Sequence, residues 1–328
     1  MTIDIYKSSK LDKFSAEEAE LYRSINEYRA INGVAPIAPS KSLSLVANRH
    51  VLDLEENIGQ ITHAWSDAEY DISDSSTWPS MWEAPKRFGT KYEDNGFENA
   101  FFSSAGATAE DALNSWSQSG GHNAVILNQD VWASSEWNAL GIGIYEDYAV
   151  MWVGESSDPA GRPKGNTKGI KTGNDKNNKV KGSKIDDILT GLGGKDRLLG
   201  KKGNDILGGG DGKDKIKGQA GDDILFGGEG DDILKGGSGN DILYGGAGSD
   251  RLSGNGGDDI FVVEPGNGID VVTDFGKGSD RLGVTGSLSA SDLTFSQDGN
   301  NTIVSVSGTQ VMTLQNVSGI DQSLITIL

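Results

Sequence analysis

The stretch that decides the fold is DILFGGEGDDILKGGSGNDILYGGAGSDRL, residues 223–252, in which an Asp is followed two places later by Leu every nine residues. Outward from it, the spacing holds without a slip over residues 187–261. The repeated Asp residues are Asp187, Asp196, Asp205, Asp214, Asp223, Asp232, Asp241, Asp250 and Asp259. Their apolar partners are Leu189, Leu198, Leu207, Ile216, Leu225, Leu234, Leu243, Leu252 and Phe261. Copies that stay in phase over this length predict a repeat architecture.

The residue types of each repeat predict a cation site followed by a strand. A Gly-rich turn of six residues can adopt positive φ and bring backbone carbonyls close to an ion. The next three residues predict a short strand whose middle side chain points inward. Carbonyl and carboxylate oxygens are the ligands that Ca²⁺ prefers. The chain has no Cys and its three His lie outside the array, so the repeats do not indicate zinc.

The array resembles the RTX (repeats-in-toxin) nonapeptide, GGxGxDxUx, which that family folds into a calcium-loaded parallel β-roll. One coil takes two repeats, so turns eighteen residues apart stack and share an ion. The resemblance implies at most seven Ca²⁺, held by the nine Asp with turn carbonyls from Gly227, Gly230, Gly236, Gly239, Gly245 and Gly248. Earlier turns, which carry Leu192, Lys201, Lys202 and Lys213, are expected to bind more weakly.

The residues flanking each inward Leu predict two different outer faces. Alternate repeats place Ile after the Asp, at Ile188, Ile206, Ile224, Ile242 and Ile260. The intervening repeats have Arg197, Lys215, Ile233 and Arg251 at this place, with Lys217 and Lys235 two residues further on. One sheet should therefore present an apolar ladder and the other a basic one. The apolar ladder either packs on the C-terminal module or a partner, or reflects β-propensity alone.

Composition bears on the compartment and the partners. The net charge of −19 over 328 residues argues against nucleic acid and suits a protein that binds several divalent cations. No apolar run is long enough to span a bilayer. Residues 1–13 lack the apolar core of a cleaved signal peptide. The RTX resemblance implies export by a type I machinery that reads an uncleaved C-terminal signal, and hence an extracellular protein that folds on calcium outside the cell.

The first half of the chain predicts helices packed on a sheet. Ser15 and Glu18 form a capping box that opens a helix, and a second helix is expected over residues 40–56. His50 falls on that helix as a packed or partly exposed side chain. A third helix is predicted over 109–117 and two strands over 139–145 and 149–155. Residues 57–108 predict long aromatic-rich loops.

Several ordered motifs here resemble the CAP superfamily (cysteine-rich secretory proteins, antigen 5, pathogenesis-related 1), also called SCP. They are Asn26 with Arg29, Leu45-x-Ala47 with His50, His63, Glu98-Asn99, the run WSQSGGHNAVIL at 116–127 and LGIG at 140–143. The resemblance implies an α-β-α sandwich over about residues 14–156. It also implies a cleft formed by His63, Glu98 and His122, which in some members holds zinc. Ser119 stands where a second family Glu is expected.

Three roles remain open for this cleft. Two imidazoles and a carboxylate could hold Zn²⁺ or another divalent metal with an open position. Glu98 could instead activate a water, as in a metal-dependent hydrolase or peptidase. The third possibility is a buried polar network in which the carboxylate accepts hydrogen bonds from both rings.

The expected fold class is α+β plus all-β. The chain divides into a CAP-like sandwich (1–158), a linker (159–172), the roll (173–262) and a C-terminal β cap with the export signal (263–328). In the cap, residues 293–295, 302–306 and 311–314 predict a meander, and Asp270, Asp274 and Asp280 a last ion site. The expected function is a secreted calcium-binding protein whose CAP domain meets an unknown ligand or surface. The alternatives are the hydrolase and a cell-surface or matrix structural protein.

Overall fold

A computed structural model describes the chain except residues 1–3, 8–11, 68–75, 78, 130–131, 136, 166, 266–267 and 287. It separates into two compact units. One comprises Met1–Arg29 and Ile37–Thr167, and the other Ala30–Pro36 and Lys168–Leu328. We call them the N-terminal unit and the roll unit and describe each by itself. In the described part of the chain, no helix has the length and apolar character needed to cross a membrane.

Three helices of the N-terminal unit begin at polar caps, of which the sequence predicted the first. Ser15 N donates to Glu18 Oε2 (2.6 Å) and Glu18 N donates to Ser15 Oγ (3.0 Å), which confirms the capping box. Ser40 Oγ and Thr108 Oγ1 cap two further helices in the same way. The helices are α1 (Ala16–Ile31), α2 (Lys41–Asp53), the π-helix η2 (Leu54–Ile58), α3 (Pro79–Trp82), α4 (Ala84–Arg87), α5 (Ala109–Gln118) and α6 (Gly120–Ile126).

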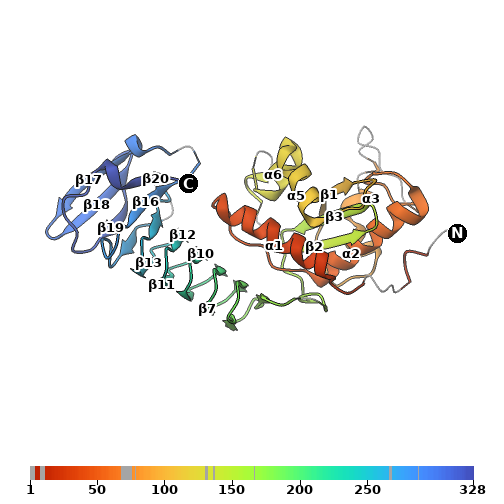
Figure 1. Cartoon of the computed structure of the whole chain (residues 1–328), viewed down its shortest axis with the longest axis horizontal. Coiled ribbons are helices and arrows are strands. Elements are labelled where there is room, and N and C mark those ends of the chain that lie inside the picture. The colour runs from red at the N-terminus through yellow and green to blue at the C-terminus, as the bar shows by residue number, and fades with distance from the viewer. Residues whose placement is uncertain are drawn as a thin grey trace. The chain divides into compact units, whose positions relative to one another are not determined.

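An antiparallel sheet of order β1-β3-β2 forms the centre of this unit (Figure 1), with β1 at Phe97–Phe102, β2 at Ala139–Tyr145 and β3 at Tyr148–Gly154. Strands β2 and β3 were predicted, but β1 falls in the stretch expected to be loop. Helix α2 lies close on the sheet at Gly141, where a Cβ would come within 2.1 Å of the Leu43 carbonyl carbon. Only a Gly allows this approach.

Several residues that carry the CAP resemblance fasten segments of this unit together. Asn26 Oδ1 accepts from Ile37 N (2.7 Å), and the Arg29 guanidinium donates to Asn128 Oδ1 (2.7 Å). The indole of Trp116 donates to the carbonyl of Ala100 on β1 (3.0 Å). These buried polar groups therefore have backbone or side-chain hydrogen-bond partners. The bonds attach α1 to neighbouring loops and α5 to the sheet.

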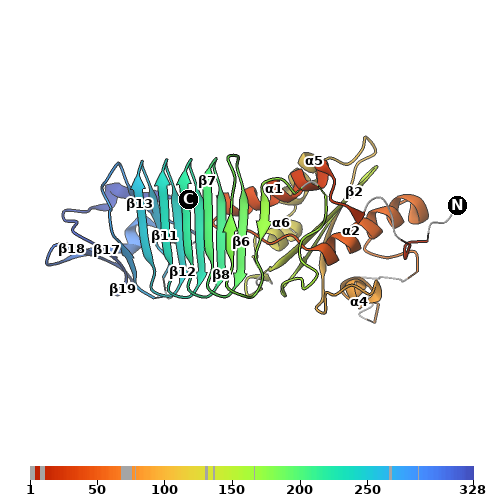
Figure 2. The same cartoon turned by 90° about the horizontal axis from the view of Figure 1, so that it is seen from below.

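The roll unit is a parallel solenoid of two sheets (Figure 2). The odd sheet contains β4 (Ile170–Thr172), β6 (Ile188–Gly193), β8 (Ile206–Asp211), β10 (Ile224–Glu229), β12 (Ile242–Ala247), β14 (Ile260–Val262), β16 (Arg281–Val284) and β20 (Ile325–Ile327). The even sheet contains β5 (Lys179–Lys181), β7 (Arg197–Lys202), β9 (Lys215–Ala220), β11 (Ile233–Ser238), β13 (Arg251–Gly256), β15 (Asp270–Val272), β17 (Leu293–Asp298), β18 (Asn301–Val306) and β19 (Thr309–Leu314). The predicted fold class is confirmed.

Residues eighteen apart pair throughout the repeats, as predicted. Leu225 pairs with both Leu207 and Leu243, and all three side chains are fully buried in the space between the sheets. The prediction of three-residue strands was wrong, because the main strands have six residues. The pairing continues through the Gly positions, for example from Gly228 to Gly246. Glycine backbones can stack closely without side chains between them.

The terminal strands extend both sheets. At the start, β4 pairs with β6 although it lies in the stretch expected as linker, and β5 pairs with β7. At the end, β17, β18 and β19 form the predicted antiparallel meander. Strand β19 then pairs in parallel with β15, and β20 with β16. On the odd sheet, the rings of Phe226 and Tyr244 stack at 4.6 Å. Residues 30–36 of the same unit lie against this sheet, since a Cβ on Gly33 would be 3.3 Å from the Tyr244 hydroxyl and one on Gly208 would be 3.1 Å from Pro36. That the apolar ladder meets the C-terminal module or a separate partner remains a prediction.

Candidate functional site

Two columns of Asp side chains run along the roll, one for each series of turns. The backbone N–H of each repeat Asp from Asp187 to Asp241 donates to Oδ1 of the Asp eighteen residues later, as from Asp187 to Asp205 and from Asp214 to Asp232 (both 2.7 Å). Every one of the nine repeat carboxylates is buried. One oxygen of each carboxylate therefore links successive coils and keeps them in register.

The second oxygen of most of these carboxylates accepts no hydrogen bond from the protein. Seven Oδ2 atoms are buried and have no protein hydrogen-bond partner, those of Asp196, Asp205, Asp214, Asp223, Asp232, Asp241 and Asp250. Buried acceptors without a partner are rare in native proteins and costly when the group is charged. Three of these atoms lie in the odd column and four in the even column, whereas the RTX resemblance implies up to four ions in the first and three in the second. These atoms are where a cation would be bound.

Backbone carbonyls converge on the same positions. A Cβ placed on Gly227 would lie 2.5 Å from Asp232 Oδ2 and 2.2 Å from the Gly245 carbonyl oxygen. On Gly209 it would meet Asp214 Oδ2 and the Gly227 carbonyl, both at 2.4 Å. At both Gly positions the nearest atoms are thus a carboxylate oxygen and a carbonyl oxygen, and a side chain there would collide with them. Oxygen ligands of both kinds suit Ca²⁺, which takes about six to eight of them at about 2.3–2.6 Å.

The predicted carbonyl ligands divide into two groups. Those of Gly227 and Gly245 lie beside Asp carboxylates, as described, and Gly236 itself lies beside Asp241, whose Oδ2 would be 2.1 Å from a Cβ placed there. Gly230, Gly239 and Gly248 have φ between +121° and +133° and form the tight turns themselves. Among the side chains that the structure describes, no three His, Cys, Asp or Glu gather as a metal-binding group. The fit to calcium therefore depends on backbone carbonyls as much as on carboxylates.

Burial makes the metal-free columns unfavourable at neutral pH. Desolvation raises the pKa of Asp232 and Asp241 to about 8 and that of Asp223 to about 7. The neighbouring carboxylates of the column add to the rise for Asp232 and Asp241. Folding without a cation therefore requires either buried negative charge or protonation. Calcium, when bound, supplies the positive charge that removes this cost.

A buried histidine cluster lies in the N-terminal unit. The Glu98 carboxylate, on β1, accepts from Nδ1 of His50, on α2, and from Nδ1 of His63 (2.7 Å). The other ring nitrogen of His50 faces the carbonyl of Ala64 (3.1 Å), and its ring stacks on Trp65 at 4.3 Å. Both Glu98 oxygens are thus engaged, and the Glu98 side chain is 0% exposed.

The structure brings together two of the three predicted cleft residues, Glu98 and His63, and adds His50 to them. His50 is a packed side chain, one of the two placements predicted for it, and its ring is the second one on the carboxylate. His122, on α6, joins β1 through its backbone carbonyl, which accepts from Asn99 Nδ2 (3.1 Å). The position of His50 in the apolar stripe of Leu43, Ala47 and Val51 was the signal that it faces the sheet. Zinc, one of the three roles left open for the cleft, has no support from a metal-binding group among the described residues.

Comparison with known proteins matches both halves of the chain. Residues 22–153 match the cysteine-rich secretory protein family, and 172–207, 208–243 and 235–270 match the RTX calcium-binding nonapeptide repeat. The chain joins a CAP domain to an RTX repeat region. No curated protein matches it.

Solved structures similar to the chain share little sequence with it. An extracellular protein containing a SCP domain from Bacillus anthracis is 18% identical, with a TM-score of 0.34 over 42% of this chain and 39% of that one. A cysteine-rich secretory protein from Staphylococcus aureus has 18% identity and a TM-score of 0.30 over 42% and 37%. An outer surface protein from Borrelia burgdorferi has 18% identity and a TM-score of 0.32 over 46% and 98%. The chain thus covers less than half the length of the first two.

The first coils of the RTX roll depart from the later ones in backbone and charge. Leu192 has φ of +75° at a position where the next coils have Gly210 and Gly228. Lys201 has φ of +97°, and the same row continues with Gln219, at φ +91°, and Gly237. Positive φ strains a residue with a side chain. The Lys201 ammonium also donates to the Gly182 carbonyl (2.7 Å), which places a fixed positive charge among turn carbonyls. Both features favour the predicted weaker calcium binding at this end.

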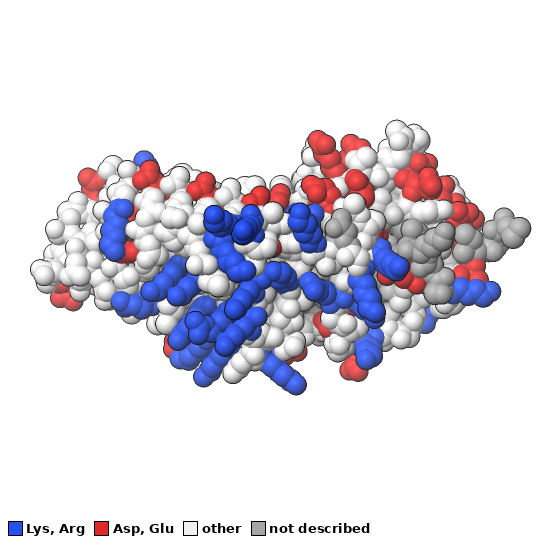
Figure 3. Space-filling model, turned by 60° about the horizontal axis from the view of Figure 1, so that its bottom comes forward, with Lys and Arg blue, Asp and Glu red and all other residues white. Residues whose placement is uncertain are grey.

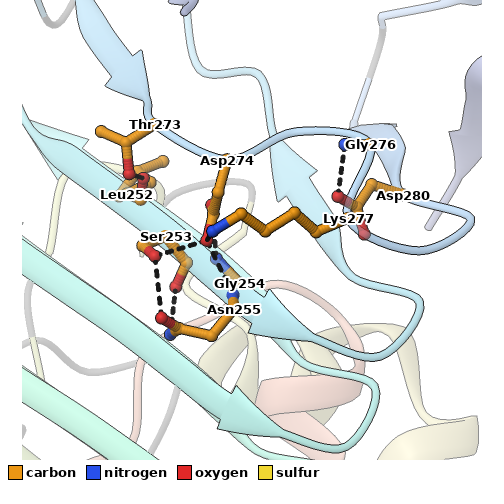
Figure 4. Close-up of polar contacts among 9 residues, drawn as sticks. All are labelled: Leu252, Ser253, Gly254, Asn255, Thr273, Asp274, Gly276, Lys277 and Asp280. Carbon is orange, nitrogen blue, oxygen red and sulfur yellow. Dashed lines mark hydrogen bonds and ion pairs between the residues drawn. The ribbon is translucent and has the colours of Figure 1, made fainter.

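The last turn of the RTX roll separates the three Asp that were predicted to form one site. Asp270 and Asp280 continue the two columns, since Asp250 N donates to Asp270 Oδ1 (3.0 Å) and Asp259 N to Asp280 Oδ1 (3.1 Å). Asp274 instead accepts hydrogen bonds from Ser253 Oγ (2.7 Å) and from the backbone N–H groups of Gly254 and Asn255 (Figure 4). Asp274 therefore binds residues within β13 and does not join Asp270.

The histidine cluster predicts a pH-dependent stability of the CAP domain. Burial raises the pKa of Glu98, but the charges and hydrogen bonds of His50 and His63 outweigh it and lower the pKa to about 2, from 4.5. The stabilisation is therefore present above about pH 4.5 and is lost as the pH falls toward 2. Glu98→Ala should lower the unfolding free energy by about 3 kcal/mol at pH 6, and by less at pH 3.

Urea unfolding in excess calcium, followed by tryptophan fluorescence, measures this difference. Glu110→Ala, which removes an exposed carboxylate on α5, is the matched control and should have little effect at either pH. A Glu98→Ala deficit of the same size at pH 6 and pH 3 would contradict the assigned role of the charge.

Proposed function

We propose that the RTX roll is a calcium-dependent scaffold that folds outside the cell and carries the CAP domain there. The observation that supports this most directly is the set of seven buried Oδ2 atoms without a protein partner. A stack of carboxylates of this kind needs a cation for each pair of coils. The scaffold is thus one whose folding responds to the calcium concentration.

The calcium concentration gives a physical reason for the compartment. Sites of extracellular modules fill at millimolar calcium, whereas cytosolic calcium is far lower. A roll built on such sites remains unfolded in the cytosol and folds after export. We also propose export through a type I machinery, because that route transports unfolded chains and the roll is unfolded before export.

For the CAP domain we propose binding of a ligand or surface rather than hydrolysis. A general base needs a carboxylate oxygen within reach of a water. Both oxygens of Glu98 instead accept hydrogen bonds from His50 and His63, and the carboxylate is enclosed. The cluster thereby connects β1, α2 and the loop that carries His63, which favours a structural role for it.

Calcium stoichiometry tests the proposal on the full-length protein. Equilibrium dialysis in excess calcium should find no more than about seven ions per chain. Asp232→Asn should reduce the number by one or two, because an amide replaces the unpartnered oxygen at the middle of the even column. Asp231→Asn makes the same change of charge at the adjacent exposed residue and should leave the number unchanged. Equal losses in the two variants would contradict the assignment of the column.

A further inference from the structure

The outer face of the even sheet concentrates positive charge on a strongly acidic protein. On β5, β7, β9, β11 and β13, the residues on either side of the buried apolar residue point outward. One outward row contains Lys179, Arg197, Lys215, Ile233 and Arg251, and the other contains Lys181, Leu199, Lys217, Lys235 and Ser253. We call these ten positions the basic face. Seven are cationic and exposed, none is acidic, and the chain as a whole carries −19.

The cations of the basic face are direct neighbours. Lys179 pairs with Arg197 and Arg197 with Lys215, while Lys217 pairs with Lys235 in the second row. Paired strands lie about 4.8 Å apart, and like charges that face each other across strands are destabilising. No ion pair between residues that the structure describes includes any of the seven. Their mutual repulsion is therefore left uncompensated by the protein.

Folding of the roll does not require this charge. The odd sheet has Ile at the equivalent positions, for example Ile206 and Ile224, and forms the same parallel ladder. Figure 3 shows Lys and Arg side chains gathered on this part of the roll. Five of them, Lys179, Lys181, Arg197, Lys215 and Lys217, also line a shallow depression of about 260 Å³. The face therefore combines a hollow with an excess of positive charge.

We propose that the basic face binds a linear acidic polysaccharide. Five strands span about 19 Å, so two rows of cations present a track for a polymer with repeated negative charges and exceed the size of a small anion. The outward positions contain no aromatic residue, which argues against single-stranded nucleic acid, since its bases stack on aromatic rings. They contain only Leu199 and Ile233 as apolar groups, too few for insertion into a lipid surface.

This inference rests on the proposed function, because the face exists only when the roll is folded. It gives the scaffold a second role, namely attachment to carboxylated or sulfated glycans. Electrostatic binding of this kind weakens as salt rises.

The test uses the full-length protein in millimolar calcium and dextran sulfate as the probe, with uncharged dextran for comparison. Binding of dextran sulfate alone, weakened by salt, is expected. A quadruple Gln variant of the basic face should bind at least about tenfold more weakly. It replaces Lys179, Lys181, Lys215 and Lys217. A matched variant neutralises four exposed lysines of the N-terminal unit and should change the affinity less than about twofold. It replaces Lys13, Lys41, Lys86 and Lys91.

Equal weakening in the two variants would overturn the proposal, as would equal affinity for dextran and dextran sulfate. Tighter binding to a single-stranded oligonucleotide or to phosphatidylserine vesicles would overturn the choice of a polysaccharide. Circular dichroism of each variant in calcium is the control for folding of the roll. A roll that folds equally in EGTA would refute the calcium proposal, and the same polysaccharide binding would then persist in EGTA.

Discussion

Removal of calcium from the full-length protein with excess EGTA is expected to abolish the β-sheet circular dichroism of the RTX roll. The columns then contain seven buried carboxylate oxygens without a partner, and protonation at neutral pH is only partial. Each ordered Gly of the array adds an entropic cost of about 0.5–1 kcal/mol relative to Ala. The roll should therefore unfold in EGTA and refold when millimolar calcium is restored.

Tryptophan fluorescence supplies the internal control for this experiment. All seven Trp lie at or before residue 152, so their emission reports the CAP domain and not the roll. EGTA should leave this emission unchanged while the β-sheet signal falls, and proteolysis should cut only within the roll. An identical β-sheet signal in EGTA and in calcium would show that the ions are not required for folding.

The second large effect is expected for Gly230→Ala. Gly230 has φ of +121°, and a Cβ there would lie 1.8 Å from the Gly212 carbonyl oxygen of the preceding coil. Because the contact is with backbone, the coils must move apart and the pairing of β10 with its neighbours is disturbed. Backbone strain of this kind costs about 1–3 kcal/mol before any loss of pairing. The calcium concentration at the midpoint of folding should rise severalfold.

Gly256→Ala is the matched control from the same array. Its Cβ would meet no atom closer than 3.9 Å, and its φ is ordinary for a residue with a side chain. The calcium midpoint of this variant should stay close to that of the wild type. Similar midpoints for Gly230→Ala and Gly256→Ala would show that close stacking of the turns does not determine the folding of the roll.

The roll could be predicted from the sequence because its contacts repeat along the chain. Each inward Leu of the repeats pairs with a residue eighteen places away, so one short stretch determines the register of the whole array. The C-terminal meander was predicted for a related reason, since its strands pair with their neighbours in sequence. Local periodicity is sufficient in both cases.

The histidine cluster could be predicted only in part because it depends on distant contacts. Strand β1 pairs with β3 some fifty residues later, and its sequence FENAFF has no regular alternation to reveal a strand. Glu98 meets His50 across 48 residues. The family resemblance indicated Glu98 and His63 but could not show which second ring the carboxylate binds. That choice follows from how α2 lies on the sheet.

The pairing of residues eighteen apart limits how the protein can lengthen. Insertion of a full coil leaves every later side chain on its own side of the solenoid. Insertion of a single nonapeptide moves all later repeats to the opposite side, so that Ile242 would continue the row of Lys215 and Arg197. Each sheet would then present apolar side chains along one part of the roll and cationic side chains along the other. Gain or loss of repeats is therefore tolerated only in even numbers.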